Sequence, residues 1–527
     1  MKKILTTWAE AEWPFVNSTQ PLATGDGLID SSGFATIEVD KLFTAINHAQ
    51  TLTGQAVLYR SLNQPLTQLD AIQQKQEAVA EIRANAQLKT ALETIVQNAA
   101  NHEKDFFLLL FGDYKGTLGT MHDGHEIEGY GYALYRKAMH FMITWVNAAQ
   151  TLEQPNSVYL QQLLARVTHF TQTRSYELMK GPVFVTENGL QSKTERQGRF
   201  SPAVLFVPKI IKPLLIAATF ALYWLLTAVV PVDMQPEIPN EAIFLTPFLL
   251  LYFPLVGGFD RDNCINPLRK IYKECQDVAD VLDVLGQLDE LLAFISVAEK
   301  SAHNMVLPHF INADRHQMHL EEAKNPVLSQ HDAHYVGNDL HLQNEKLVLI
   351  TGPNSGGKTA LSKTITQIQL LAQIGCYVPA RSVSLTVADH IFYQVPEISH
   401  LEDGEGRFGT ELKRTKAIFL ATTAKSLVVL DEMSEGTTFE EKMESSHNVL
   451  NGFYRKGNST ILITHNHQLV DLLVKEGTGD PKQVEFANEA PTYKLIAGIS
   501  RVSHADRVAK KIGFSKEDIE HYLEESK

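Results

Sequence analysis

The sequence contains little cysteine, has no excess of positive charge and lacks a start that resembles a signal peptide. Its 527 residues include three cysteines, Cys264, Cys275 and Cys376, which are too few and too scattered for a disulfide framework or a zinc site. The 61 acidic residues outnumber the 47 basic ones, and the net charge of −14 argues against a surface that binds polyanions throughout, although it allows a local basic patch. Residues 1–16 acquire acidic side chains too early for a secretory leader. We therefore expect a protein of a reducing compartment.

The composition as a whole is that of a large folded protein. Apolar residues make up 44% of the chain and charged residues 20%, which is enough for large cores and excludes global disorder. At roughly 100–200 residues per domain, the length predicts about three domains. The chain contains no internal repeat and no low-complexity segment.

Two uncharged apolar runs, Pro213–Val232 and Ala242–Phe259, stand out from this average. The first run meets the length of about 20 apolar residues that a membrane-crossing helix needs, and the second is marginal. Lys and Arg flank the outer ends of the pair, whereas the connecting loop carries only acidic charges, so the positive-inside rule places both ends in the cytoplasm. We predict a two-helix transmembrane hairpin over 205–260, lipid contact over 210–260 and anchoring in a bacterial inner membrane. The alternative is a pair of helices buried in a large core.

A phosphate-binding loop follows the short apolar run Lys346–Thr351, which is fit for a buried parallel strand. The next residues match G-x-x-x-x-G-K-[ST] in full, and a helix-like segment follows. In such a loop the glycines let backbone N–H groups point at phosphate oxygens, the lysine reaches the β- and γ-phosphates, and the threonine hydroxyl ligates Mg²⁺. The predicted ATP-binding residues are Gly352, Pro353, Asn354, Ser355, Gly356, Gly357, Lys358, Thr359 and Ala360.

Two further apolar runs end in residues suited to phosphate chemistry. Ser426–Leu430 leads directly into Asp431 and Glu432, and Ser459–Thr464 leads into His465. Because the carboxyl ends of parallel strands meet at one edge of a sheet, these side chains are expected beside the phosphate loop. Asp431 is predicted to hold Mg²⁺ together with Thr359, and Glu432 to act as general base. For His465 we expect contact with the γ-phosphate or the attacking water, the alternative being a structural role.

These motifs together resemble the ATPase domain of the MutS mismatch-repair family. The resemblance rests on LITGPNSGGKT, on the segments Ile374–Ala380, Leu427–Thr438 and Leu462–Leu469, and on the closing stretch Tyr493–Ile519. It continues more weakly upstream, where Phe34–Ile82 is similar to the start of the family's core domain and Leu268–Ser301 to its lever helix. The resemblance implies adenine contacts from Tyr335 and Asn338 and nucleotide sites shared across a homodimer of ATPases.

The sequence also departs from that family. Gly406 and Arg407 stand where better-known members have a serine and a threonine in the signature loop, so Arg407 is either a substitute contact to the γ-phosphate or a surface residue. The family's mismatch-reading domain uses a Phe-x-Glu motif, and the only such motif here, at Phe439, follows the strand that ends in Asp431. That domain is therefore expected to be absent.

The predicted architecture is multidomain, with an all-α core and lever region, the transmembrane hairpin and an α/β P-loop ATPase. Its parts are 1–33, 34–204 (helical core), 205–260 (hairpin), 261–315 (lever helix), 316–490 (ATPase) and 491–527 (helical dimerisation segment). We expect an Mg²⁺-dependent ATPase whose dimer changes conformation with ATP binding and hydrolysis, with DNA as a candidate partner. The alternative is a membrane-anchored ABC-type ATPase whose levers act on a membrane process without binding DNA.

Overall fold

The computed structural model describes residues 27–114, 126–196, 202–218, 221, 252–353, 356–396, 406–433, 439–487, 490–500 and 512–525. The chain divides into two compact units. Of the described residues, the first unit contains Ala49–Ala56 and those of Ala84–Asp289, and the second contains 27–48, Val57–Arg83 and those from Glu290 onward. Helices α4 (Leu52–Asn63) and α13 (Gln276–Lys300) contribute residues to both units.

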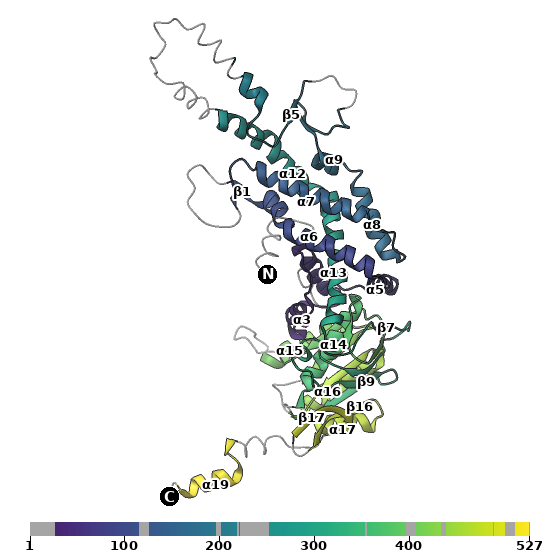
Figure 1. Cartoon of the computed structure of the whole chain (residues 1–527). Helices are drawn as coiled ribbons and strands as arrows, with labels where there is room; N and C mark the ends of the chain where they lie inside the picture. Colours follow the sequence, from purple (N-terminus) through teal and green to yellow (C-terminus); the bar gives the residue numbers. More distant parts are fainter. Residues whose placement is uncertain are drawn as a thin grey trace. The chain divides into compact units, whose positions relative to one another are not determined.

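The first unit is mainly helical. Helix α6 (Ala86–Phe111) packs along α7 (Tyr132–Gln150), because both carry apolar residues at helical spacing on one face (Figure 1). Asn85 caps α6 by accepting a hydrogen bond from the Leu88 N–H at 3.1 Å. The described part of this unit also contains α8 (Val158–Phe170), α9 (Arg174–Lys180), the π-helix η2 (Arg261–Ile265), α12 (Asn266–Glu274) and the first part of α13. Short strands β1 (Asp113–Tyr114) and β2 (Glu126–Ile127) pair in parallel.

Two buried carboxylates in the first unit hold the start of α4. Asp289 accepts hydrogen bonds from the backbone N–H groups of Gln50 at 3.1 Å and Thr51 at 2.7 Å, and from the Thr51 hydroxyl at 2.7 Å. Glu103 accepts from the N–H groups of Leu52 and Thr53 and from the Thr53 hydroxyl. The carboxylates thereby supply acceptors for donors that a helix start leaves unpaired. We call Glu103 and Asp289 the carboxylate clamp.

The predicted transmembrane hairpin over 205–260 is wrong as far as the structure describes this segment. Its first residues lie in strand β5 (Val204–Phe206), which joins β3 (Val183–Thr186) and β4 (Gly189–Gln191) in an antiparallel sheet of order β4-β3-β5. Residues 213–218 and 252–260 are helical, while most of the two apolar runs lies outside the described residues. None of the helices in the described ranges combines the length and the apolar character needed to cross a membrane.

The ends of the apolar runs are held by polar contacts to the helical core. Lys212 Nζ lies 2.6 Å from Asp260 Oδ2, and the Tyr132 hydroxyl donates to the same oxygen at 2.5 Å. The Tyr252 hydroxyl donates to the Ile210 carbonyl at 3.2 Å. Lys212, which the sequence assigned to a membrane flank, is thus the partner of a buried carboxylate. The predictions of membrane anchoring and of lipid contact over 210–260 are wrong together with the hairpin.

The second unit is built on a six-stranded sheet of order β13-β14-β15-β10-β16-β17. All neighbouring strands are parallel except β16 and β17, so the sheet is mainly parallel, as predicted. Its central strands are apolar and buried on both faces, which is typical of parallel sheets. The strands are β13 (Ile391–Gln394), β14 (Leu427–Asp431), β15 (Ser459–Ile463), β10 (Leu347–Thr351), β16 (Asp480–Ala487) and β17 (Ala490–Ala497).

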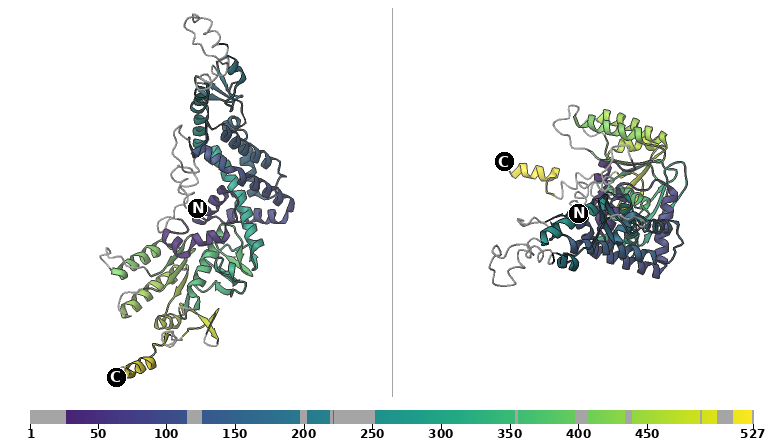
Figure 2. Two further views of the ribbon diagram at one scale, coloured as in Figure 1. Left: turned by 60° about the vertical axis from the view of Figure 1, so that its left-hand side comes forward. Right: turned by 90° about the horizontal axis from the view of Figure 1, so that it is seen from above.

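Helices cover this sheet and close its core. Helices α15 (Gly406–Ala421) and α16 (Phe439–Lys456) lie on the same side of the sheet (Figure 2), and the rings of Phe419 and Phe453 meet edge to face between them. Their apolar residues and those of α17 (His467–Lys475) pack with strand residues such as Leu349 and Val428. Helix α14 (Lys358–Gln373) is almost wholly buried. This burial fixes the strand ends and the start of α14, where the site lies.

A smaller sheet and several short helices complete the second unit. The sheet has the order β7-β12-β8-β9, formed by β7 (His309–Phe310), β12 (Ser382–Leu385), β8 (Met318–Ala323) and β9 (Asn338–Leu342). Strands β6 (Met305–Val306) and β11 (Val378–Pro379) pair separately, and the 3₁₀ helix η3 (Leu328–His331) precedes β9. The predicted segment from 491 begins within β17 and ends in α19 (Lys516–Glu525). The remaining helices are α2 (Ser31–Ile37), α3 (Val39–Ile46) and α5 (Leu69–Ala84).

Candidate nucleotide-binding site

The phosphate loop joins the end of β10 to the start of α14. Gly352 and Gly357 have φ angles of 137° and 81°, conformations in which an L side chain is strained, so glycine is needed at both positions. The Lys358 side chain turns back over the loop, and its Nζ donates a hydrogen bond to the Gly352 carbonyl at 2.6 Å. Burial lowers the pKa of Lys358, while the nearby carboxylates of Glu432 and Asp431 oppose this shift. Two predicted residues of the loop, Asn354 and Ser355, lie outside the described residues.

Asp431 lies at the end of β14 and faces the start of α14. The Thr359 hydroxyl donates to Asp431 Oδ2 at 3.1 Å, which brings together the two residues predicted to hold Mg²⁺. Burial raises the pKa of Asp431 above its ordinary value, and the Thr359 hydrogen bond acts in the opposite direction. A carboxylate that is partly desolvated and keeps a hydroxyl beside it is well placed to bind a cation.

Glu432 continues β14 by one residue and adopts a left-handed backbone. Its φ angle is 56°, an uncommon conformation for a residue with a side chain, and its N–H donates to the Ile463 carbonyl at 2.9 Å. Its carboxylate Oε1 lies 3.0 Å from His465 Nε2, and the same nitrogen lies 3.5 Å from Lys358 Nζ. Strained residues of this kind concentrate at functional sites, where the surrounding fold holds them.

Five predicted side chains therefore meet at one edge of the sheet. They come from the helix that follows β10 and from the ends of β14 and β15, which are adjacent in the strand order. Parallel register brings these ends level, with Asp431 opposite Ile463. The five are Lys358, Thr359, Asp431, Glu432 and His465.

A cavity of about 510 Å³ adjoins the phosphate loop. Its walls include the predicted residues Tyr335, Asn338, Gly356, Gly357 and Ala360. Burial raises the pKa of Tyr335, so this side chain presents a neutral phenol to the cavity. The volume and mixed lining are those of a small-molecule site.

Tyr493 also lines this cavity, and the sequence assigned it no nucleotide contact. Its φ angle is 61°, and its ring carbon Cδ1 would lie 3.2 Å from a Cβ added at Gly357. Asn338 holds this part of β17 in place, because its side-chain amide donates to the Tyr493 carbonyl at 3.0 Å and accepts from the Leu495 N–H at 2.7 Å. No local pattern could reveal this contact, since it depends on β17 returning along β16.

The chain was compared with known proteins. Residues 26–181 match the family model "MutS domain III", and residues 348–524 match "MutS domain V". These two segments are therefore similar to two domains of the MutS family. The site described above lies in or beside MutS domain V, and the start of the MutS domain III segment belongs to the second unit.

Curated relatives agree with the MutS assignment. A DNA mismatch repair protein MutS of Thermotoga sp. (strain RQ2) is 29% identical over 53% of this chain and 36% of its own length. DNA mismatch repair protein msh3 of Aspergillus terreus is 30% identical over 46% of this chain and 23% of its own length. A MutS of Desulforamulus reducens is 31% identical over 47% of this chain and 30% of its own length. The chain thus spans about a third or less of the curated relatives it matches.

The residues at the edge of MutS domain V fit a magnesium ion. Mg²⁺ prefers oxygen ligands and is usually held by one or two protein oxygens together with phosphates and water. Thr359 and Asp431 offer one hydroxyl and one carboxylate at hydrogen-bond distance. In the described ranges, no group of three or more His, Cys, Asp or Glu side chains is placed to hold a metal ion.

The signature-loop residues of MutS domain V stay predictions. The backbone of Gly406 and Arg407 forms the first turn of α15, but their side chains lie outside what the structure describes.

Proposed function

We propose that this chain is a MutS-like ATPase that binds ATP with Mg²⁺, hydrolyses it in a homodimer and uses the cycle to change its conformation while it interacts with DNA. The observation that carries the proposal is the meeting of Lys358, Thr359, Asp431, Glu432 and His465 at one sheet edge. A random cluster of charges would not combine a phosphate loop, a cation site and a base at the ends of adjacent strands.

Each side chain has a role that follows from its position. Lys358 gives up its carbonyl contact and places its ammonium group at the β- and γ-phosphates. Thr359 and Asp431 hold Mg²⁺, which neutralises phosphate charge when it is bound. Glu432 accepts a proton from the attacking water, and His465, 3.0 Å away, fixes the direction of its carboxylate.

The adjoining cavity accommodates the base of the nucleotide. Tyr335 and Tyr493 offer aromatic faces on which adenine can stack. Asn338 has both ends of its amide engaged by β17, so it shapes the cavity by holding Tyr493.

Dimerisation and DNA binding are proposed from the family. The described part of the C-terminal segment exposes Ile512, Phe514 and Leu523, apolar side chains that a second copy of the chain would cover. DNA interaction is supported by the matched relatives, whose names are those of DNA mismatch repair proteins. Retention on heteroduplex DNA, measured at several salt concentrations, tests this part. An absence of salt-dependent binding would remove DNA from the proposal.

The hydrolytic role of Glu432 is tested by Glu432→Gln. We expect this variant to bind ATP and to turn it over at least about 100-fold more slowly, because general-base catalysis contributes typically 10²–10⁴-fold. Glu440→Gln, on an exposed residue in the first turn of α16, is the matched control and should leave turnover unchanged. Unchanged turnover in Glu432→Gln would show that another group is the base. Arg407→Ala, assayed in parallel, should slow turnover only if Arg407 contacts the γ-phosphate.

A further inference from the structure

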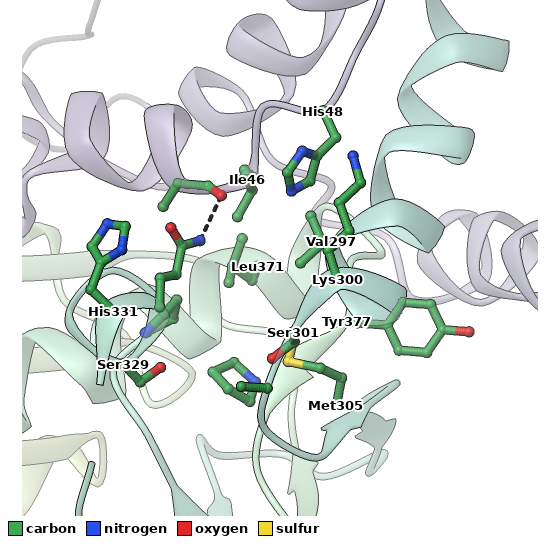
Figure 3. Close-up of a pocket in the computed structure, with 15 residues that line it drawn as sticks. Ile46, His48, Val297, Lys300, Ser301, Met305, Ser329, His331, Leu371 and Tyr377 are labelled. Carbon is green, nitrogen blue, oxygen red and sulfur yellow. Dashed lines mark hydrogen bonds between the residues drawn. The ribbon is translucent and has the colours of Figure 1, made fainter. Parts of the chain in front are cut away.

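A second cavity of about 220 Å³ lies in the second unit, apart from the phosphate loop. Its walls come from the end of α3 and the residues after it, the last turn of α13, η3 and the end of α14 (Figure 3). The Gln330 side chain closes one side by donating to the Ala45 carbonyl at 2.6 Å. We call this space the η3 cavity and define it by Ile46, His48, Val297, Lys300, Ser329 and Leu371.

Three basic side chains, His48, Lys300 and His331, line the η3 cavity together with neutral polar groups. Figure 3 shows the nitrogen-bearing ends of His48 and Lys300 close together, and His331 on the opposite side. No carboxylate side chain occurs among the lining residues that the structure describes. The carboxylate of Glu299, which precedes Lys300 in the chain, interacts electrostatically with Arg83. Two basic side chains that converge without an acid between them favour an anion.

The remaining walls are apolar. Ile46 and Leu371 are fully buried and Val297 nearly so, and all three line the cavity. A cavity with one charged end and an apolar body suits a ligand built in the same way. Burial and the Lys300 charge both lower the pKa of His48, so an anion at this end would relieve the repulsion that Lys300 exerts on a protonated His48.

The η3 cavity and the nucleotide cavity share a wall. Ser329, Gln330 and His331 of η3 line the first, whereas Leu328 and Asp332 line the second. Helix α14 is also shared, since Leu371 faces the η3 cavity and Leu361 the nucleotide cavity. Helix η3 has only four residues, so a single turn separates the two cavities. A ligand that shifts η3 from the η3 cavity would therefore also move the wall of the nucleotide cavity.

We propose that the η3 cavity is a second ligand site, which binds a small molecule with a carboxylate or phosphate head at His48 and Lys300 and an apolar body against Ile46, Val297 and Leu371. Its occupant alters nucleotide affinity through η3, and this coupling rests on the proposed ATP site. By reciprocity, ATP alters the affinity of the second ligand by the same factor.

Phenyl phosphate is a suitable probe, because it combines a phosphate head with an apolar ring. Isothermal titration with the full chain, saturated with ADP so that the phosphate loop is filled, should detect binding. Lys300→Gln and His48→Gln should each weaken it at least about tenfold, since a hydrogen bond to a charged group is worth about 1.5 kcal/mol or more and 1.4 kcal/mol is tenfold. Lys270→Gln, on an exposed lysine of α12, is the matched control and should change nothing. Phenol, the uncharged analogue, should bind more weakly than phenyl phosphate.

The outcomes separate the site from the coupling. Three outcomes would overturn the second site. Phenyl phosphate could fail to bind, it could bind wild type and both variants with equal affinity, or phenol could bind as tightly as phenyl phosphate. Two variants are used because each changes a side chain that is not fully buried, so both should fold.

The coupling is tested with a fluorescent ATP analogue. Its affinity for the wild type should change at least about twofold when phenyl phosphate is added, and its affinity for Lys300→Gln should not change. Phenyl phosphate binding without that change would overturn the coupling. Failure of any nucleotide to bind would contradict the proposed function and leave the second site standing.

Discussion

Two pairs of acids in this protein, one buried and one half-buried, have opposite surroundings. In the first unit, Glu103 and Asp289 of the carboxylate clamp accept hydrogen bonds from backbone N–H groups and threonine hydroxyls of one chain segment. In the second unit, Asp431 contacts Thr359, and Glu432 contacts His465, which lies beside Lys358. Burial raises the pKa of Glu103 and of Asp431, and the charge of the neighbouring acid, Asp289 or Glu432, acts in the same direction.

The comparison teaches that burial of an acid does not by itself identify a functional site. The clamp acids are paired with permanent backbone donors, so they stabilise the start of a helix. The acids at the sheet edge contact side chains that can exchange their partners for phosphate and Mg²⁺. Substitutions in the two pairs should therefore separate stability from nucleotide binding.

The largest effect is expected for Lys358→Ala at the sheet edge. Loss of the ammonium group should weaken ATP binding at least about 100-fold, because it removes charge-assisted contacts to two phosphates. The free energy of unfolding should change by less than about 1 kcal/mol, since the cost of burying this charge offsets its hydrogen bond. Lys363→Ala, on the same helix and paired with Glu38, is the control for equilibrium nucleotide binding. Wild-type ATP affinity in Lys358→Ala would refute the phosphate-loop assignment.

The opposite pattern is expected for Asp289→Ala in the clamp. Removal of this acceptor leaves the buried N–H and hydroxyl donors of Thr51 and the part-buried N–H of Gln50 without their partner, and it should lower the free energy of unfolding by about 3 kcal/mol. ATP affinity of the folded protein should not change. Asp280→Ala, on an exposed residue of the same helix, should cost less than about 0.5 kcal/mol in a urea titration. A small effect of Asp289→Ala on the free energy of unfolding would show that the carboxylate clamp does not stabilise this unit.

A third prediction concerns the pH dependence of stability. Burial, opposed by the hydrogen bonds of Leu52 and Thr53, raises the pKa of Glu103 to about 7 from an ordinary value near 4.5. Between these values the folded protein holds a proton that the unfolded chain has lost. The stabilisation is therefore complete below about pH 4.5 and is lost as pH rises through 7, with a slope of up to about 1.4 kcal/mol per pH unit.

Glu103→Gln should remove this slope. Urea titrations at several pH values between 5 and 8 would show the difference between the two proteins. The difference isolates Glu103, because the raised pKa of Asp431 gives a slope of the same sign in both. Parallel curves for wild type and Glu103→Gln would mean that Glu103 is not the titrating group.

The smallest effect is expected at the wall of the nucleotide cavity. Tyr493→Ala should weaken ATP binding by about three- to tenfold, since an aromatic stacking contact is worth about 0.5–1.5 kcal/mol. Tyr493→Phe keeps the ring and should bind ATP as wild type does. Equal affinity of all three proteins would place the adenine away from Tyr493.

Local pattern predicted which side chains meet at the sheet edge, while their chemical roles stay predictions. The phosphate loop, Asp431, Glu432 and His465 each follow a short apolar run, and a buried parallel sheet forces such strand ends to one edge. The prediction of a transmembrane hairpin over 205–260 also relied on apolar runs, and it was wrong. Hydropathy alone could not show that Lys212 pairs with Asp260, or that Leu205 and Phe206 pair with strand β3.

The sequence by itself determined the residues of the phosphate site and their order along the chain, because neighbouring residues of one loop or strand end need no distant partner. Tertiary structure alone decided what lies beside them. It brought Tyr493 and Asn338 together across strands, and it placed Asp289 on the N–H group of Thr51, 238 residues away. Hydrogen bonds between such distant segments depend on the packing of the whole unit, and no local periodicity records that packing.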